Sequence, residues 1–367
     1  MSPSAITRRQ INRATLARQL LLDRVDWTPL EAIHQLLGLQ AQVPREPYIG
    51  LWSRLTNFRR EDLTQLLDQR AVVRATLMRS TLHLFASDDY LLLRATLQPA
   101  LTRALYSFFG QNARDLDVPW LIKHMRAHLE VEPHTFTDLR PVLTNLDPDS
   151  DTEAMAYALR THVPLVQVPA ASKWGYPNNP AFATVEAWLG ASIDPDANPR
   201  ALILRYLAAF GPAYPRDVQV WSGLTNLLEV VEALKPELQV YHDERGKEVL
   251  DLPDFALPDE DIPAPIRFLP EYDNLILSHA DRSRFVPDEF RKLVFLSAGR
   301  VRATVLIDGM VAGTWKAERL KDAAALVITP FAPLSAELQA SLADEARRLI
   351  RFIEEDAATV DVRFESA

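Results

Sequence analysis

Two glutamines separated by a single residue are the side chains whose type and spacing point most directly to chemistry. Gln40 and Gln42 lie in the stretch 37–44, shortly before Pro44. Because proline disfavours helical backbone in the residue before it, this stretch is expected to be extended. Residues two apart in an extended chain point to the same side. The spacing therefore predicts a pair of neutral amides at the mouth of a groove, able to hold water or a polar edge without carrying charge.

A purely structural interpretation of the same glutamines is also open. Apolar residues at Leu30, Ile33 and Leu36 predict a helix that ends near residues 38–42. The last carbonyl groups of a helix have no partner within it. Amide side chains at that end would then cap the helix and take part in no reaction.

The elements that must position these glutamines begin as helices and then change to strands. Helices are expected at residues 6–24, from Pro29 onward, and at 48–55 and 60–68. Strands at 71–78 and 80–85 follow, joined by a turn at Arg79, and then helices at 87–101 and 104–116. Helices followed by a two-stranded hairpin are typical of a winged helix, which places Arg79 at the tip of the wing.

This order of elements recurs twice and then gives way to a strand-rich region. The second round has helices at 119–129, 136–145 and 152–161, then a hairpin of 163–168 with the segment near Lys173 and Trp174. The third has helices at 198–210, 215–224 and 226–235, then strands at 239–242 and 248–252. A linker is expected at 252–265, followed by strands at 301–307, 310–315 and 326–329, a helix at 335–356 and a strand at 360–364. The architecture repeats, whereas the sequence does not.

Composition narrows the class of protein. The chain has 367 residues, 48% of them hydrophobic and 24% charged, which fits a soluble protein of two to four modules. It has no cysteine, which excludes disulfides, a thiol nucleophile and a thiolate metal site. No apolar run is long enough to cross a bilayer, and the first ten residues lack an apolar signal core. A cytoplasmic location without membrane association is expected.

Charge is distributed unevenly along the chain. The formal net charge is −9, but residues 1–130 hold 17 Lys and Arg against 12 Asp and Glu. Sixteen of those 17 basic residues are arginine, whose planar guanidinium can donate two hydrogen bonds to a phosphate. Residues 131–264, by contrast, hold 9 basic against 21 acidic residues. A basic face on an acidic protein is compatible with DNA binding.

Five passages together resemble one known family. They are Gln40–Gln42, the run 79–83, the run 210–223, the run 269–284 and the hairpin 307–315. The chain resembles the winged-helix DNA-binding-domain family that contains the AlkZ-type DNA glycosylases. The resemblance implies an α+β fold of three tandem winged-helix modules and a C-terminal β-rich, barrel-like domain, arranged as a C around a DNA channel. The expected boundaries are 1–117, 118–195, 196–264 and 265–367.

The resemblance also implies an activity. Members characterised as enzymes hydrolyse the N-glycosidic bond of alkylated purines, notably N7-alkylguanine, and some unhook interstrand crosslinks. Their catalytic motif is Gln-apolar-Gln, which Gln40 and Gln42 match, whereas a related branch has Asp at the second position. The expected partner is double-stranded DNA with alkylated purines, bound by a monomer associated with the nucleoid. No metal, nucleotide or other cofactor is expected, and no abasic-site lyase activity, because no lyase lysine is evident.

Two amides suffice for such a reaction only when the substrate supplies most of the driving force. Alkylation at N7 gives guanine a positive charge, so the base leaves neutral and needs little acid assistance. The transition state resembles a sugar oxocarbenium ion. An amide carbonyl can stabilise that cation and orient the attacking water. The rival hypotheses are a non-catalytic winged-helix DNA-binding protein or regulator, and a resistance protein narrowed to one crosslinking natural product.

Nine further residues are candidates for DNA contact. Arg45 either touches phosphate or is solvated, and Arg79 is expected to meet a groove. His83 is either packed or catalytic. The remaining candidates are Lys173 at the second hairpin and a polar set expected to line the DNA channel: Asp273, His279, Asp281, Arg282 and Arg284. In the alternative interpretation, Asp281 and Arg284 form a structural ion pair.

Overall fold

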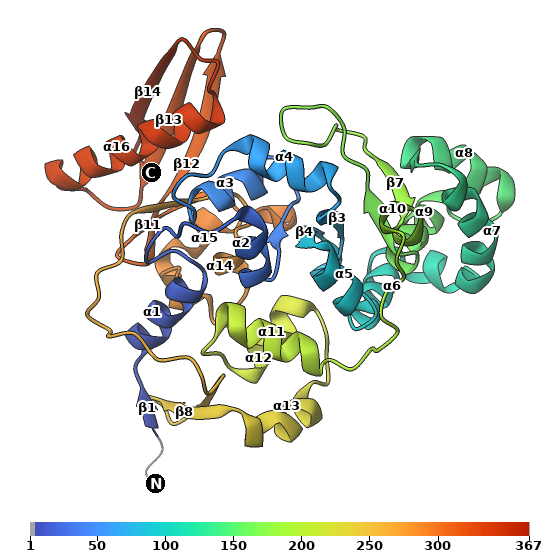
Figure 1. The fold of residues 1–367 in the computed structure, drawn as a ribbon, viewed down its shortest axis with the longest axis horizontal. Helices are drawn as coiled ribbons and strands as arrows, with labels where there is room; N and C mark the ends of the chain where they lie inside the picture. Colours follow the sequence, from blue (N-terminus) through green and yellow to red (C-terminus); the bar gives the residue numbers. More distant parts are fainter. Residues whose placement is uncertain (1–3, 367) are drawn as a thin grey trace.

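The computed structural model describes residues 4–366, which form a mixed α+β protein with three separate sheets (Figure 1). One sheet has six strands, one has five and one has three. Helices surround the six-stranded and three-stranded sheets, while one long helix lies along the five-stranded sheet near the C-terminus. None of the helices in this part of the chain combines the length and apolar content that a membrane crossing requires.

The six-stranded sheet carries the glutamine segment on its edge. Its strand order is β2-β4-β3-β6-β7-β5. These strands are β2 (Leu39–Gln40), β3 (Val72–Thr76), β4 (Leu82–Ala86), β5 (His134–Thr135), β6 (Leu165–Gln167) and β7 (Ala181–Thr184). The antiparallel pairing of β3 with β4 confirms the predicted hairpin of the first round.

The second hairpin differs from the prediction in two ways. Strand β6 pairs with β7 (Ala181–Thr184), and the segment at Lys173 and Trp174 is a loop. Strand β6 also pairs with β3, with Arg74 opposite Gln167, so that the first two rounds share one sheet. The local pattern identified strands, but the choice of partner depends on burial between elements far apart in sequence.

Most N-terminal helices lie close to the predicted ranges, but the first is shorter, the helix expected at 87–101 ends at Leu93, and the helix expected at 104–116 already begins at Gln98. They are α1 (Arg8–Arg18), α2 (Pro29–Gln35), α3 (Glu46–Trp52), α4 (Arg60–Asp68), α5 (Ser87–Leu93) and α6 (Gln98–Arg114). Thr7 and Thr28 each form a capping box at the start of a helix. Helix α1 ends before Leu20, whose φ is +56°, because Leu20 and Leu21 turn away from it into two different hydrophobic cores.

The second and third rounds supply the remaining helices of this part of the fold. The second contains α7 (Val118–Val131), α8 (Phe136–Leu146), α9 (Thr152–His162) and the short α10 (Val185–Leu189). The third contains α11 (Arg200–Phe210), α12 (Pro215–Ser222) and α13 (Leu228–Leu234), followed by the predicted hairpin of β8 (Gln239–Asp243) and β9 (Glu248–Asp251). Strand β1 (Ser4–Ile6) joins that hairpin through a parallel pairing with β8.

The C-terminal region is an open sheet covered by a helix. Its order is β10-β11-β12-β13-β14, with β10 (Arg267–Leu269), β11 (Thr304–Ile307), β12 (Met310–Leu320), β13 (Ala323–Pro330) and β14 (Thr359–Phe364). The expected barrel-like closure is wrong, because β10 and β14 form opposite edges of this sheet within residues 4–366. Helix α16 (Ala336–Ile353) covers the sheet instead and buries apolar residues such as Leu349 and Ile353 in a core shared with β11–β13 (Figure 1).

The run 269–284 forms compact turns of helix, and its residues 273–279 are buried. After β10 the chain enters α14 (Asn274–Leu277) and then a single 3-10 turn at Arg282–Arg284. The segment packs between α1, α11 and the C-terminal sheet, so its polar residues meet protein partners.

Candidate active site

The glutamine segment leaves α2 through two left-handed residues and enters the edge of the sheet. Leu37 and Gly38 have φ values of +53° and +79°. A Cβ at Gly38 would lie 2.1 Å from the Phe85 ring, so the position requires glycine on two grounds. The Gly38 N–H donates to Ile33 O at 3.0 Å, so the backbone itself closes the end of α2. The glutamine side chains are therefore not its caps.

Gln40 is held by a guanidinium. Its side chain is almost fully buried, and Oε1 accepts a 2.7 Å hydrogen bond from Arg79 Nη2. Arg79 lies in the turn between β3 and β4, with a φ of +53°, and its other nitrogen donates to the Trp221 carbonyl oxygen in α12. Since a guanidinium can only donate, the carbonyl side of the Gln40 amide must face Arg79. The predicted wing tip thus points inward, onto the glutamine.

Gln42 is held by the same hairpin. Its side chain is exposed, and Oε1 accepts a hydrogen bond from the Leu82 N–H at 3.3 Å. A backbone N–H is also a donor only, so this amide has one permitted orientation as well. Within residues 4–366 neither amino group of the two glutamines has a hydrogen-bond acceptor. The result is a pair of amides with fixed orientation, one buried and one open to solvent.

Two residues outside the predicted set clamp this segment from opposite sides. Arg74 on β3 donates to Ala41 O at 2.9 Å and to Gln42 O at 3.3 Å. Asn274 donates to Gly38 O at 2.7 Å and accepts from the Gln40 N–H at 3.3 Å. Asn274 lies within the run 269–284, which was the available sequence signal for it. Nothing in the sequence indicated a role for Arg74, because a single polar residue within a predicted strand is common.

The interior of the site is positive. Burial, together with the charge of the nearby Arg282, lowers the pKa of Arg79 to about 10. Among the residues described, no carboxylate lies within ion-pair distance of Arg79. An arginine so placed remains charged at neutral pH. The site therefore contains a guanidinium without an anionic partner beside an amide.

His83, which lies opposite Gln40 in the sheet, is neutral. Burial and the charge of Arg79 lower its pKa to about 3. Its Nδ1 donates to the Thr81 carbonyl oxygen at 3.0 Å, which leaves Nε2 as a bare acceptor. That nitrogen is buried and has no protein partner among the residues described. His83 is therefore packed in the interior and is not a cation that could contact phosphate.

Two candidates from the run 269–284 are interior residues with structural partners. Asp273 forms a bidentate ion pair with Arg54, with both oxygens at 2.9 Å. Arg284 donates to Pro212 O at 3.0 Å and lies 3.4 Å from Asp217. The ion pair between Arg284 and Asp281, which was the alternative interpretation of the sequence, does not form. These residues position the segment and present no surface to a DNA channel.

His279 is also interior. It is buried, and its Nε2 lies 3.5 Å from Phe210 O, a distant contact. Burial lowers its pKa well below the ordinary value, so it is neutral at pH 7. His279 and Asp273 do not form an acid–base pair, because Asp273 is bound to Arg54.

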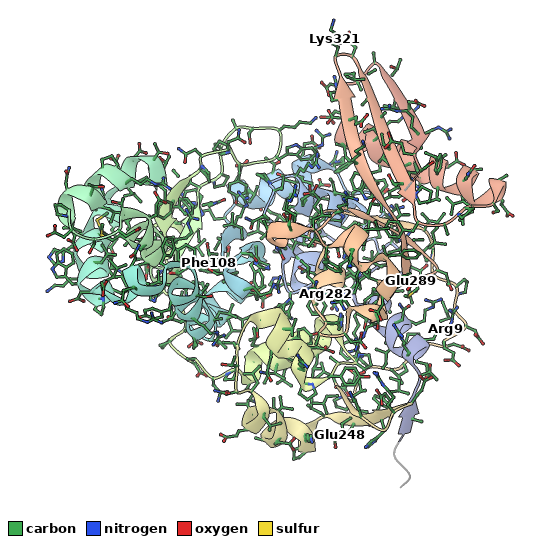
Figure 2. All side chains as sticks on the ribbon, turned by 180° about the vertical axis from the view of Figure 1, so that it is seen from behind. Arg9, Phe108, Glu248, Arg282, Glu289 and Lys321 are labelled. Carbon is green, nitrogen blue, oxygen red and sulfur yellow. The ribbon has the colours of Figure 1, made fainter. Side chains whose placement is uncertain are left out.

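The remaining candidates lie at or near the surface. Arg45 pairs with Glu46 at 2.7 Å, and Lys173 pairs with Glu354 at 2.8 Å. Asp281 is exposed and accepts from the Ser283 N–H at 3.1 Å. Arg282 is half-buried and lies 4.2 Å from the centre of the Phe295 ring. Figure 2 shows Arg282 near the middle of the molecule, between the third group of helices and the C-terminal region.

Glu46, four residues after Gln42 in the chain, is a titratable residue that the sequence did not single out, and it forms hydrogen bonds with Arg45 and Glu271. It is buried in the first turn of α3, and this burial raises its pKa to about 7. Arg45 opposes the shift, and the Glu271 N–H donates to Glu46 Oε2 at 2.8 Å. An acid in the first turn of a helix is normally exposed, so the sequence carried no signal of its burial.

Comparison with known proteins places the chain in a family. A family model described as "DNA glycosylase AlkZ-like" matches residues 33–352. An interstrand DNA cross-link repair glycosylase of Streptomyces sahachiroi is 26% identical over 382 residues, covering 96% of this chain and 95% of the relative. The solved structure of the DNA glycosylase AlkZ from the same organism matches with a TM-score of 0.77 at 20% identity, covering 99% of this chain and 100% of that one. The matched residues include both glutamines and the run 269–284, and the chain belongs to the AlkZ-like family of DNA glycosylases.

Proposed function

We propose that this DNA glycosylase hydrolyses the N-glycosidic bond of N7-alkylated purines in double-stranded DNA, with Gln40 and Gln42 at the reacting sugar. One observation carries the proposal. Each amide is held in a single orientation by a partner that can only donate, Arg79 for Gln40 and the Leu82 N–H for Gln42. Preorganised dipoles of this kind stabilise charge without having to reorganise during the reaction.

The amide carbonyls retain the capacity that the chemistry needs. A carbonyl oxygen has two lone pairs, and the scaffold uses one on each glutamine. The second lone pair can face the sugar or accept a hydrogen bond from the attacking water. The water oxygen bonds to C1′, the C1′–N9 electron pair returns to the alkylated base, and the released proton passes to solvent.

The charge of the site favours a substrate that brings its own positive charge to the leaving group. No ionised carboxylate contacts either glutamine side chain among the residues described, and His83 is neutral. A strong general base or acid is therefore lacking, and a neutral base would leave slowly. We propose a monofunctional hydrolase that leaves an abasic site in an intact strand.

The wider arrangement belongs to the same proposal. The three hairpins, β3–β4, β6–β7 and β8–β9, act as the wings of three winged-helix modules bounded by residues 1–117, 118–195 and 196–264, with the C-terminal region from 265. Together they form a C-shaped channel in which a monomer holds the duplex. Arg45, Lys173 and Arg282 lie at the surface and can reach phosphate. The Streptomyces sahachiroi relative is named for cross-link repair, and we extend that substrate class to this chain.

The decisive experiment measures base release from duplex DNA that contains N7-methylguanine. We expect Gln42→Ala to lower the single-turnover rate by about 100-fold, as loss of a preorganised dipole does elsewhere. Gln65→Ala, on the exposed face of α4, is the matched control and should retain the wild-type rate. An unchanged rate in Gln42→Ala would remove these glutamines from the reaction. A tight, sequence-specific footprint without base release would indicate a non-catalytic regulator.

A further inference from the structure

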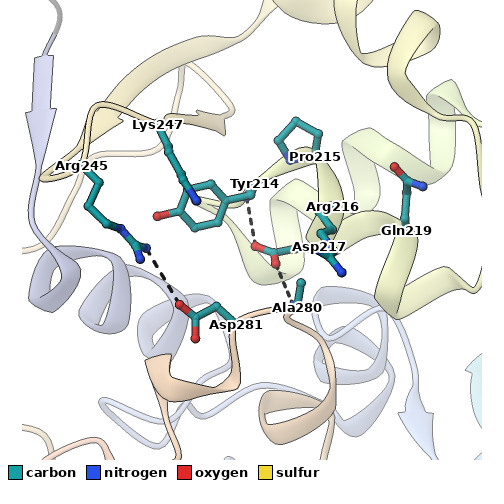
Figure 3. Close-up of a pocket in the computed structure, with 9 residues that line it drawn as sticks. All are labelled: Tyr214, Pro215, Arg216, Asp217, Gln219, Arg245, Lys247, Ala280 and Asp281. Carbon is teal, nitrogen blue, oxygen red and sulfur yellow. Dashed lines mark hydrogen bonds and ion pairs between the residues drawn. The ribbon is translucent and has the colours of Figure 1, made fainter.

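A second site lies at the opposite end of α12 from the glutamines. A cavity of about 810 Å³ opens between the first turn of α12, the turn that joins β8 to β9, and the loop at residues 280–281 (Figure 3). Arg216 reaches it from α12, while Arg245 and Lys247 reach it from the hairpin turn. Neither Gln40 nor Gln42 lines this cavity.

The basic residues of this part of the chain are divided between ion pairs and the cavity. Residues 196–264 contain 6 Lys and Arg against 13 Asp and Glu. The three basic residues outside the cavity are each in a close ion pair: Arg200 with Glu237 at 2.6 Å, Arg205 with Asp89 at 2.5 Å, and Lys235 with Glu248 at 2.6 Å. The three inside it are the other half of the set.

The cavity residues lack comparable partners. Within residues 4–366, the side chains of Arg216 and Lys247 make no hydrogen bond or ion pair. Arg245 approaches Asp243 at 3.5 Å and Asp281 at 3.9 Å, with a side chain that is 63% exposed. In a module with a two-to-one excess of acid, three basic side chains gathered around one hollow are poorly neutralised by protein.

The two acidic residues on the cavity wall neutralise its three basic residues only in part. Asp217 is buried, accepts from the Tyr214 and Ala280 N–H groups at 3.0 and 2.8 Å, and neighbours Arg284 (Figure 3). Asp281 accepts from Ser283 on its own turn. The hollow therefore keeps a positive balance and suits an anion with several acceptor oxygens.

The fold connects this hollow to the glutamines. The carbonyl oxygen of Trp221, in the last turn of α12, accepts from Arg79, which also holds Gln40. Arg282 follows the cavity residue Asp281 and is close enough to Arg79 to affect its ionisation. A helix of this length spans roughly 10 Å. Basic residues thus follow a strip from the cavity through Arg282 to Arg79.

We infer that the cavity of Arg216, Arg245 and Lys247 binds a phosphate of the DNA backbone on the duplex whose lesion faces Gln40 and Gln42. The distance from the cavity to the glutamines is the length of α12 plus the length of the Arg79 side chain. Successive phosphates advance by roughly 3.4 Å along the duplex axis, so the bound phosphate lies within about five nucleotides of the lesion. This inference rests on the proposed function for its geometry, because that function places the lesion at the glutamines.

The test is the salt dependence of binding to undamaged duplex, which requires no chemistry. In R216A/K247A we expect the slope of log K against log salt to become shallower by about 0.9, the value for the one phosphate that the protein no longer neutralises. The matched control, R200A/K235A, removes the same charge from ion-paired positions of the same module and should keep the wild-type slope. Equal slopes in wild type and R216A/K247A would overturn the inference.

Duplex length locates the site relative to the lesion. Wild type should bind a duplex that extends about eight base pairs beyond an N7-methylguanine more tightly than one that extends about two, by roughly tenfold at low salt. For R216A/K247A the two duplexes should bind with nearly equal affinity, so that this ratio falls toward one. A ratio that stays at the wild-type value would overturn the inference. If wild type releases no base, the proposed function fails, while the salt slope still decides whether the cavity binds phosphate.

Discussion

Arg79 and Gln40 are joined by a 2.7 Å hydrogen bond from a half-buried guanidinium to an amide oxygen. The two residues come from different elements, the β3–β4 turn and the edge strand β2, and the same arginine also reaches α12. Arg79 therefore fixes the orientation of one glutamine and ties the third group of helices to the candidate active site. In the proposed function it is a positioning residue that acts through Gln40.

Removing the Arg79 guanidinium should impair base release through Gln40. We expect Arg79→Ala to lower the single-turnover rate by about 10- to 100-fold, with a smaller effect on DNA affinity, because the amide loses its fixed orientation. In a Gln40→Ala background, Arg79→Ala should cost little more, as expected for coupled residues. Kinetics on the four proteins of this cycle test the relationship, and additive losses would contradict it. Partial rescue by Arg79→Lys would support a role for charge as well as geometry.

The charge on the leaving base should determine which lesions are released. We expect N7-methylguanine and 3-methyladenine, both cationic, to be excised at least about 1000-fold faster than a neutral lesion such as hypoxanthine, because no group at the site can supply general acid assistance worth that factor. Single-turnover rates on matched duplexes provide the comparison. Rapid release of hypoxanthine would indicate an acid that the geometry of the glutamines does not provide.

His83 should make the fold sensitive to acid. Its pKa is about 3 in the folded protein, against an ordinary value of 6.5. Between those values the unfolded chain binds a proton that the folded chain does not. The difference in pKa therefore stabilises the folded protein. This contribution is complete above pH 6.5 and is lost on acidification, by about 1 kcal/mol per pH unit. Urea unfolding at pH 7 and pH 5 should show a smaller loss for His83→Leu than for wild type. Equal losses would mean that His83 is protonated in the fold.

The ionisation of Glu46 should lower the stability of the folded protein as the pH rises, which is the opposite of the effect of His83. The pKa of Glu46 is raised to about 7 in the folded protein from an ordinary 4.5, so the folded state binds the extra proton between these values. Its contribution to stability is full below pH 4.5 and is lost as the pH rises toward 7. We expect the stability of Glu46→Gln relative to wild type to improve by about 1–3 kcal/mol from pH 5 to pH 8. Urea midpoints at both values measure this change, and a pH-independent difference would contradict the assignment.

Local sequence patterns predicted much of the fold. Periodicity and turn residues placed most helices and the β3–β4 and β8–β9 hairpins, because these depend on neighbours close in the chain. They could not give the β3–β6 pairing, nor the open C-terminal sheet. Those features depend on which apolar faces meet across long separations.

The sequence predicted the two amides of the candidate site, but it did not predict which residues surround them. The spacing of Gln40 and Gln42 already indicated a pair of side chains on an extended segment. The inward direction of Arg79 depends on a carbonyl 142 residues away, and the burial of Asp273 depends on an arginine 219 residues away. From the sequence alone, a polar residue in a loop is predicted to be exposed, because its distant partner cannot be identified.

The pairing of β6 with β3 makes the first two hairpins a single body. Strands joined by ladder hydrogen bonds lie about 4.8 Å apart and do not hinge freely, so these two hairpins keep a constant separation. A duplex that touches both meets a stiff template. Any mismatch in shape then has to be absorbed by bending of the DNA, and a duplex weakened by damage bends at lower energetic cost. Continuity of the sheet can thus contribute to the search for lesions before any base reaches the glutamines.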